Sequence, residues 1–147
     1  LAAGIFFGRP AFLGTVRPDG RPHAAGVGAL WMDGEIYFTS GAGTRKARNL
    51  ALNPACTLSA SLATIDVVLE GEAQRVLDIA ILERAAARCR EAGWPVEAAG
   101  DAITGLFNAP SAGPPPWNLY RFSFHTAIGN ATAEPHGATL WRFATEG

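Results

Sequence analysis

The sequence predicts a mainly β protein: a largely antiparallel barrel with helices inserted between its strands. Short β-rich segments follow one another in the first half, with tight turns between them. Helical patterns interrupt these strands but do not alternate with them regularly, as a parallel α/β sheet requires. Neither a G-x-G-x-x-G nor a Walker motif is present, so a Rossmann or P-loop fold has no motif to support it.

Composition limits the kinds of partner. The chain has 147 residues, 48% hydrophobic and 17% charged, with a net charge of −1, and we expect a single domain over residues 1–147. A near-neutral chain has no global field for nucleic acid or a membrane surface, so any anion site must be local. The two cysteines and three histidines show no metal-ligand spacing, so we expect no metal. The apolar opening run is far shorter than a membrane span, and we expect a cytoplasmic protein.

The first elements are strands joined by turns. Ala11–Val16 is followed by a Pro-Asp-Gly turn, and Pro22–Met32 by the two-residue hairpin signal Asp33-Gly34. Glu35–Thr39 completes that hairpin, because its order Glu-Ile-Tyr-Phe-Thr favours a strand. The sequence therefore predicts a meander of three strands before the first helix.

A short helix over Thr44–Leu52 comes next, with Thr44 as its N-cap and Asn53-Pro54 as its stop. Two further strands, Ala55–Ser61 and Ile65–Arg75, follow it. We expect them to extend the same antiparallel arrangement.

The second half is more mixed. Asp78 caps an amphipathic helix over Ile79–Ala92, with Gly93 beyond its C-terminus, and a weaker helical pattern covers Glu97–Phe107. A proline-rich loop then leads to two closing strands, Asn118–Ile128 and Ala138–Ala144.

Basic residues occur at the N-terminal end of the first predicted helix, where cations are unusual. Arg45, Lys46 and Arg48 occupy its start, where the helix dipole already carries partial positive charge. A bound phosphate would reverse that penalty, because free backbone N–H groups, the hydroxyls of Thr39, Ser40 and Thr44 and these cations would converge on it. Lys46 is also the one lysine among 12 basic residues. The alternative is a solvated basic helix end without a ligand.

A run of small residues marks the second strand. His23-Ala24-Ala25-Gly26-Val27-Gly28-Ala29 lacks the bulk that strands usually carry. Small side chains permit the close approach of a flat ligand, but they also suit a bulge or a tightly packed strand. From the residues alone both interpretations stay open.

Several of these segments resemble a known family. The segment 11–23, the strand–loop–helix of 34–50 with Asn53-Pro54, and Gly71-Glu72-Ala73 are similar to the pyridoxamine 5′-phosphate oxidase-like superfamily. Trp117, the segment 120–122 and the closing segment 138–143 resemble its branch that uses the 5-deazaflavin coenzyme F420. The Trp141-Arg142-Phe143 segment does not reproduce the C-terminal arginine motif of true pyridoxamine phosphate oxidases, which argues against vitamin B6 oxidation.

The resemblance implies an FMN-binding type of split β-barrel, a homodimer with a cofactor at each subunit interface. Gly26, Val27 and Gly28 match the strand beside the cofactor ring. The phosphate-side positions match Thr39, Ser40, Thr44, Arg45, Lys46, Arg48 and Asn49. Arg48, together with Arg9, Arg17 or Arg21, could meet the longer anionic tail of F420. The number of aromatic residues near the C-terminus exceeds what a small barrel is expected to bury alone, which also suggests a dimer: Trp117, Phe122, Phe124, Trp141 and Phe143.

No side chain is an obvious acid or base, so catalytic residues stay unassigned and a cofactor is expected to supply the chemistry. The leading hypothesis is an F420-dependent reductase that transfers hydride to a small planar acceptor. An FMN-dependent oxidoreductase on the same fold is the alternative, and a non-catalytic flavin or deazaflavin carrier is the second alternative.

Overall fold

The computed structural model describes residues 10–109 and 111–143; Arg9 lies outside them. It is a mainly antiparallel β structure with two described helices, α2 (Arg45–Leu52) and α3 (Ile79–Glu91). The strands are β1 (Ala11–Val16), β2 (Pro22–Val27), β3 (Ala29–Met32), β4 (Glu35–Gly41), β5 (Ala55–Ser61), β6 (Ile65–Val76), β7 (Val96–Ala99), β8 (Ala102–Gly105), β9 (Trp117–Ala131) and β10 (Ala138–Arg142). No helix among these residues is long and apolar enough to span a membrane.

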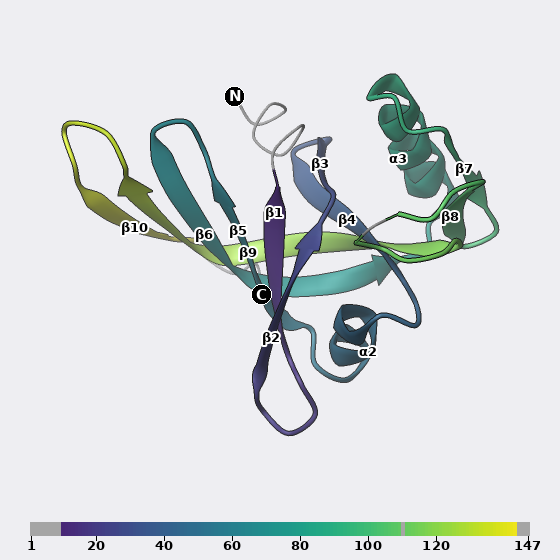
Figure 1. Ribbon diagram of the computed structural model, residues 1–147, viewed down its shortest axis with the longest axis horizontal. Helices are drawn as coiled ribbons and strands as arrows, with labels where there is room; N and C mark the ends of the chain where they lie inside the picture. Colours follow the sequence, from purple (N-terminus) through teal and green to yellow (C-terminus); the bar gives the residue numbers. More distant parts are fainter. Residues whose placement is uncertain (1–9, 110, 144–147) are drawn as a thin grey trace.

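The strands form one ten-stranded sheet with the central order β2-β1-β5-β6-β9-β4-β3 (Figure 1). Every pairing is antiparallel. The long strand β9 pairs with β6, β4, β10 and β8, so it connects both halves of the sheet. This open, curled sheet is a split β-barrel, which confirms the predicted fold class.

The predicted strand Pro22–Met32 is two strands that separate at Gly28. Its first part, β2, pairs with β1 at one edge of the sheet, and its second part, β3, pairs with β4 at the other edge. Because β2 and β3 follow each other in the chain, this segment runs from one edge of the open sheet to the other. The position that a Cβ on Gly28 would take faces open space, with no atom within 4 Å.

The prediction of a helix over Glu97–Phe107 is wrong. The segment is the hairpin β7–β8, with Gly100 at a φ of 62° in the turn. Val96 and Ile103 are buried between this hairpin and the rest of the chain, and Ile103 pairs with Trp117 of β9. Burial of these apolar residues outweighs the local helix propensity of Glu-Ala-Ala.

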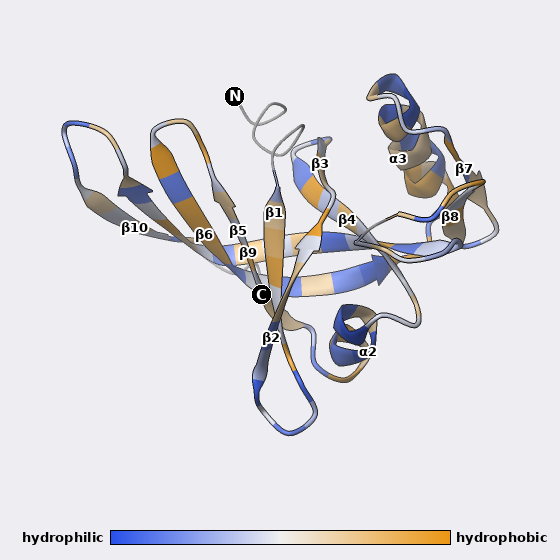
Figure 2. Cartoon of the chain, viewed as in Figure 1, coloured by the Kyte–Doolittle hydropathy of each residue, from blue (hydrophilic) through white to orange (hydrophobic). Residues whose placement is uncertain are grey.

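The apolar residues gather on both sides of the sheet. The barrel interior holds Leu13, Phe38 and Leu58, while α3 covers the other side through Leu82 and Ala86. Figure 2 shows hydrophobic and hydrophilic stretches alternating along β6 and α3. Among the aromatic residues suggested for an interface, Trp117 and Phe122 are buried within the chain, whereas Trp141 and Phe143 stay about half exposed, at 45% and 48%.

A β-bulge interrupts the longest pairing. The register of β6 with β9 shifts between Glu70 and Gly71, so that His125 is the additional residue on β9. At Gly71 the strands approach so closely that a Cβ would lie 1.9 Å from the Ser123 carbonyl oxygen. The bulge therefore requires glycine at position 71.

Candidate functional site

The start of α2 is built around Thr44, which is its N-cap. The Thr44 hydroxyl accepts a hydrogen bond from the Ala47 N–H (3.2 Å) and donates to the Gly41 carbonyl (2.9 Å). It also lies 2.6 Å from the hydroxyl of the fully buried Ser40. Both hydroxyls thus fix the shape of the loop before α2 through contacts within the chain.

Asn49 ties the helix to the barrel. Its side chain is fully buried and donates from Nδ2 to the Thr15 hydroxyl of β1 at 3.0 Å, while its Oδ1 has no partner. This contact sets the rotation of α2 against the sheet, and with it the direction of the basic side chains at the helix start.

Lys46 is a buried cation. Only 4% of its surface is exposed, and its Nζ donates to the Ser111 carbonyl. Within residues 10–109 and 111–143, no carboxylate lies within ion-pair distance of Lys46. Burial lowers the pKa of Lys46, as expected for a charge removed from water without a counter-ion.

His23 lies within electrostatic range of Lys46 and of two further cations, Arg17 and Arg45. The pKa of His23 on β2 is lowered, first by burial and then by the positive charges of Arg17, Lys46 and Arg45. These charges are close enough to repel a proton on His23, although the whole chain carries a net charge of −1. The positive charge is therefore local, where the β1–β2 hairpin meets the start of α2.

The loop after the β7–β8 hairpin covers this region. The Gly41 N–H donates to the Ala112 carbonyl at 2.9 Å, and a Cβ on Gly41 would lie 2.6 Å from that oxygen. The neighbouring Ser111 carbonyl accepts from Lys46. The Lys46 Nζ and the Gly41 N–H, two donors that an anion could use, are thus hydrogen-bonded to backbone carbonyls. An anion that binds Lys46 directly would compete with the Ser111 carbonyl.

The other residues suggested by the sequence lie elsewhere. Thr39 faces the α3 side of the sheet, opposite to its neighbour Ser40. Arg48 is exposed and lines a cavity of about 460 Å³ together with Gln74, Arg75 and Asn118. Val27 is a core residue, while Gly28 is exposed. Of the suggested phosphate-side cations, Arg45 and Lys46 act electrostatically on His23 together with Arg17.

Sequence reasoning did not assign His23 or Ser111 to this region. The predicted hairpin could have located His23, because a turn over 17–20 places His23 opposite Thr15 on the neighbouring strand. No local pattern marks Ser111, which is 65 positions from Lys46 in the chain.

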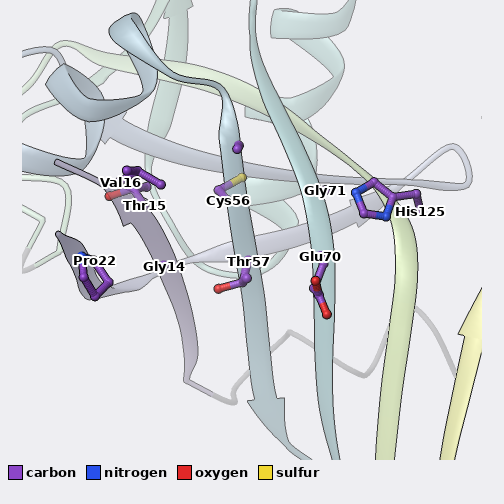
Figure 3. Close-up of a pocket in the computed structure, with 10 residues that line it drawn as sticks. Gly14, Thr15, Val16, Pro22, Cys56, Thr57, Glu70, Gly71 and His125 are labelled. Atoms are coloured by element: carbon purple, nitrogen blue, oxygen red, sulfur yellow. The ribbon is translucent and has the colours of Figure 1, made fainter. Parts of the chain in front are cut away.

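A cavity of about 340 Å³ opens on the outer face of the sheet, lined by Gly14, Thr57, Glu70 and His125 (Figure 3). Cys56 also borders it, but burial, helped by the charge of Glu72, raises the pKa of this thiol to about 12. The thiol is therefore protonated at neutral pH and is a poor nucleophile. The described residues contain no group of three or more His, Cys, Asp or Glu side chains that could share a metal ion.

Fold and site define a split β-barrel protein with positive charge concentrated at the start of its first described helix. The chain belongs to the pyridoxamine 5′-phosphate oxidase family, whose model matches residues 8–126. No curated protein matches the chain.

Solved structures share the fold. General stress protein 26 from Bacillus anthracis is 17% identical, with a TM-score of 0.61 over 97% of this chain and 95% of its own. A pyridoxamine 5′-phosphate oxidase-related, FMN-binding protein from Nostoc punctiforme is 17% identical, with a TM-score of 0.63 over 92% and 81%. A protein described as an F420 reductase is 22% identical, with a TM-score of 0.56 over 84% and 91%.

The charge on His23 predicts how anion binding depends on pH. The free protein holds the His23 pKa below its ordinary value of 6.5, so the ring is neutral at pH 7. A bound anion favours the protonated ring, so we expect sulfate, whose own charge is constant in this range, to bind more tightly as the pH falls from about 7.5 to about 5. Calorimetric titration measures this trend, and His23→Gln should flatten it while the exposed control His136→Gln retains it.

The same shift acts on stability. Because the folded pKa lies below the unfolded one, the folded chain binds fewer protons than the unfolded chain in the window between them. Without anion, the contribution of His23 to stability is complete above pH 6.5 and falls as the pH drops toward the lowered pKa. For the binding prediction, a sulfate affinity of the wild type that does not change with pH would contradict the coupling between anion binding and protonation of His23.

Proposed function

We propose that this chain is an F420-dependent reductase that transfers hydride from the cofactor to a small planar acceptor. The observation that carries the proposal is the buried Lys46, which has no carboxylate partner in the described part of the chain and stands among Arg17, His23 and Arg45. Burying an unpaired charge is costly, and a bound phosphate group is the counter-ion that would offset that cost.

Each part of the site has a distinct role in this proposal. Lys46, Arg45 and Arg17 hold the phosphate, and His23 accepts a proton when the anion binds. Thr44 and Asn49 keep the helix start in position through their contacts with Gly41 and Thr15. The reduced deazaflavin would supply hydride-transfer chemistry, so the chain itself needs to bind, orient and shield rather than to act as acid or base.

Two features favour F420 over FMN. F420 carries a phosphodiester and a glutamate tail, so its negative charge extends further from the ring than that of FMN. Arg48 is exposed, as is Arg21, which pairs with Asp19 at 3.9 Å, and both could meet such a tail. Exposed pairs of this kind contribute only about 0.2–1 kcal/mol each and weaken with salt. The resemblance of the closing segment 138–143 to the deazaflavin branch supports the same choice.

The test is to isolate the protein from a host that lacks F420. We expect a colourless preparation that binds added F420, with the affinity falling as salt rises, and that then reduces an acceptor in steady state. A yellow preparation with stoichiometric FMN that F420 does not displace would favour the FMN alternative. Tight F420 binding without turnover of any acceptor would favour the carrier.

We also propose that the functional unit is a homodimer with the cofactor at the interface. A row of cross-strand neighbours crosses the outer face of six strands, and its apolar members are partly exposed. In order the row is Gly26, Phe12, Ser59, Val68, Ile128 and Leu140. The next row, with Gly14 and Thr57, lines the cavity of Figure 3. The row thus forms a ridge, and the cavity forms a groove beside it. A ridge beside a groove can pack against the same surface of a second copy about a two-fold axis.

Light scattering at micromolar concentration should therefore give twice the chain mass. Phe12→Glu, which places a charge on the ridge where Phe12 is 51% exposed, should shift the protein toward monomer. The matched surface change Leu106→Glu, away from the ridge, should not. A wild-type protein with the mass of one chain would refute the dimer.

A further inference from the structure

An open cleft of about 410 Å³ lies where the end of α3 meets the β7–β8 hairpin. α3 and this hairpin stand at the opposite end of the molecule from β10 (Figure 1). The cleft is lined by Arg90, Glu97, Thr104 and Leu106, none of which is among the residues suggested for the cofactor. It is therefore separate from the basic residues around Lys46 and from the ridge proposed for the dimer.

Arg90 brings a positive charge to this cleft. It stands in the last turn of α3, where the helix dipole favours a cation. Its Nη1 donates to the Val96 carbonyl at 2.9 Å, which fixes the guanidinium beside the cleft. Within residues 10–109 and 111–143, the Arg90 side chain makes no other hydrogen bond and no ion pair. Its other N–H groups are free to bind a carboxylate.

Glu97 brings a negative charge to the same cleft. It follows Val96 on β7, and its cross-strand neighbour on β8 is Thr104. In the described part of the chain, neither the Glu97 carboxylate nor the Thr104 hydroxyl has a hydrogen-bond partner. A carboxylate with a hydroxyl beside it suits an ammonium group, which donates up to three hydrogen bonds.

The two charges line one cleft without forming an ion pair with each other. Several other arginines on the surface do have a carboxylate partner at 2.7–3.9 Å: Arg21, Arg75, Arg84 and Arg121. The hydrogen bond to the Val96 carbonyl holds the Arg90 guanidinium in another direction. A ligand that carries both a carboxylate and an ammonium group could bridge Arg90 and Glu97.

Leu106 gives the cleft an apolar wall. Its side chain is fully exposed, while the ring of its neighbour Phe107 packs between Trp94 and Trp117, with ring centres 6.2 and 5.3 Å away. Pro95 adds a second apolar surface. An apolar group of a ligand that covers Leu106 would remove apolar surface from water, which is favourable.

We propose that this cleft binds a free α-amino acid with an apolar side chain, such as leucine. The α-carboxylate binds Arg90, the α-ammonium binds Glu97 and Thr104, and the apolar side chain lies against Leu106. The volume of the cleft falls within the roughly 300–1,000 Å³ of small-molecule sites. Because no residue suggested for the cofactor takes part, this site does not depend on the proposed redox function.

The probes are leucine and three compounds that each lack one of its features. Leucinamide lacks the carboxylate, N-acetyl-leucine lacks the ammonium, and glycine lacks the apolar side chain. In calorimetric or NMR titrations, leucine should bind at millimolar concentration and more tightly than each of the three. The ionic contacts are open to solvent, so we expect each to contribute about twofold to fivefold in affinity.

Two variants separate the two charges. Arg90→Gln should weaken leucine binding about twofold to fivefold and leave leucinamide binding unchanged. Glu97→Gln should weaken leucine binding to a similar degree and leave N-acetyl-leucine binding unchanged. Arg84→Gln is the matched control on the same helix, because Arg84 pairs with Asp33 at 3.1 Å, and it should change neither affinity.

A measurement on the unaltered protein guards against a variant that fails to fold. Leucine should shift the NMR signals of the Thr104 and Gly105 amides and leave that of the Gly41 amide in place. Absence of these shifts at millimolar leucine, or equal weakening of leucine and leucinamide in Arg90→Gln, would overturn the proposal. A separate F420 titration keeps the two proposals apart, because F420 binding without leucine binding would overturn only this inference.

Discussion

Replacing Lys46 with Met should lower the affinity for a phosphate-bearing cofactor about tenfold to a hundredfold and leave the chain folded. Charge-assisted hydrogen bonds to phosphate contribute roughly 1.5–3 kcal/mol, and this variant removes the buried cation that would make them. Methionine fills the same narrow volume without charge, so the loss of the contact with Ser111 is offset by relief from burying an unpaired ammonium. Titration with F420 and with FMN, beside urea unfolding of the free protein, measures both effects.

The comparison variants define the site. Arg45→Ala should weaken binding in the same direction but less, because Arg45 is only half-buried. Arg84→Ala removes an equal charge from α3, where Arg84 pairs with Asp33 at 3.1 Å, and should leave cofactor affinity unchanged. If both Lys46→Met and Arg45→Ala bind the cofactor as the wild type does, the phosphate lies elsewhere.

Gly71→Ala should be the most destabilising single methyl addition in the sheet. The new Cβ would lie 1.9 Å from the Ser123 carbonyl oxygen and 2.6 Å from the Phe124 Cα, both of them backbone atoms that cannot rotate away. Strands β6 and β9 must separate at the bulge, which we expect to cost about 3 kcal/mol or more, at the upper end of overpacking effects. Thermal unfolding should then shift down by roughly 6–12 °C.

Gly137→Ala is the control for this prediction. No atom lies within 4 Å of the position of its Cβ, and its φ is not in the left-handed region, so stability should change little. Equal melting temperatures for the two variants would show that the strands at the bulge can relax without cost.

Local patterns in the sequence were sufficient for most of the barrel. Strand alternation and the turn at Asp33-Gly34 predicted β1 and β4, and the caps Thr44 and Asp78 predicted the starts of α2 and α3. The β7–β8 hairpin was missed because its helix-forming residues are held as strands by burial of Val96 and Ile103, a tertiary effect. The division at Gly28 was also missed, since it depends on which distant strand each half pairs with.

The sequence predicted which residues gather at the candidate site, but not the directions in which their side chains point. The basic helix start indicated Arg45 and Lys46, yet strand alternation sends Thr39 and Ser40 to opposite sides of β4. Helix rotation, set by the Asn49–Thr15 contact, separates Lys46 from the exposed Arg48. These directions arise from packing between segments far apart in the chain, which no window of neighbouring residues contains.

The pairing of β9 has a consequence for synthesis of the chain. Strands β4 and β6 both find their second partner in β9, which begins only at Trp117. On the ribosome, all earlier strands can therefore be complete while two inner edges of the future sheet still lack their neighbour. Such unpaired edges are templates for association with other chains. The interval between the emergence of β6 and that of β9 is thus the time at which a nascent chain most needs a chaperone.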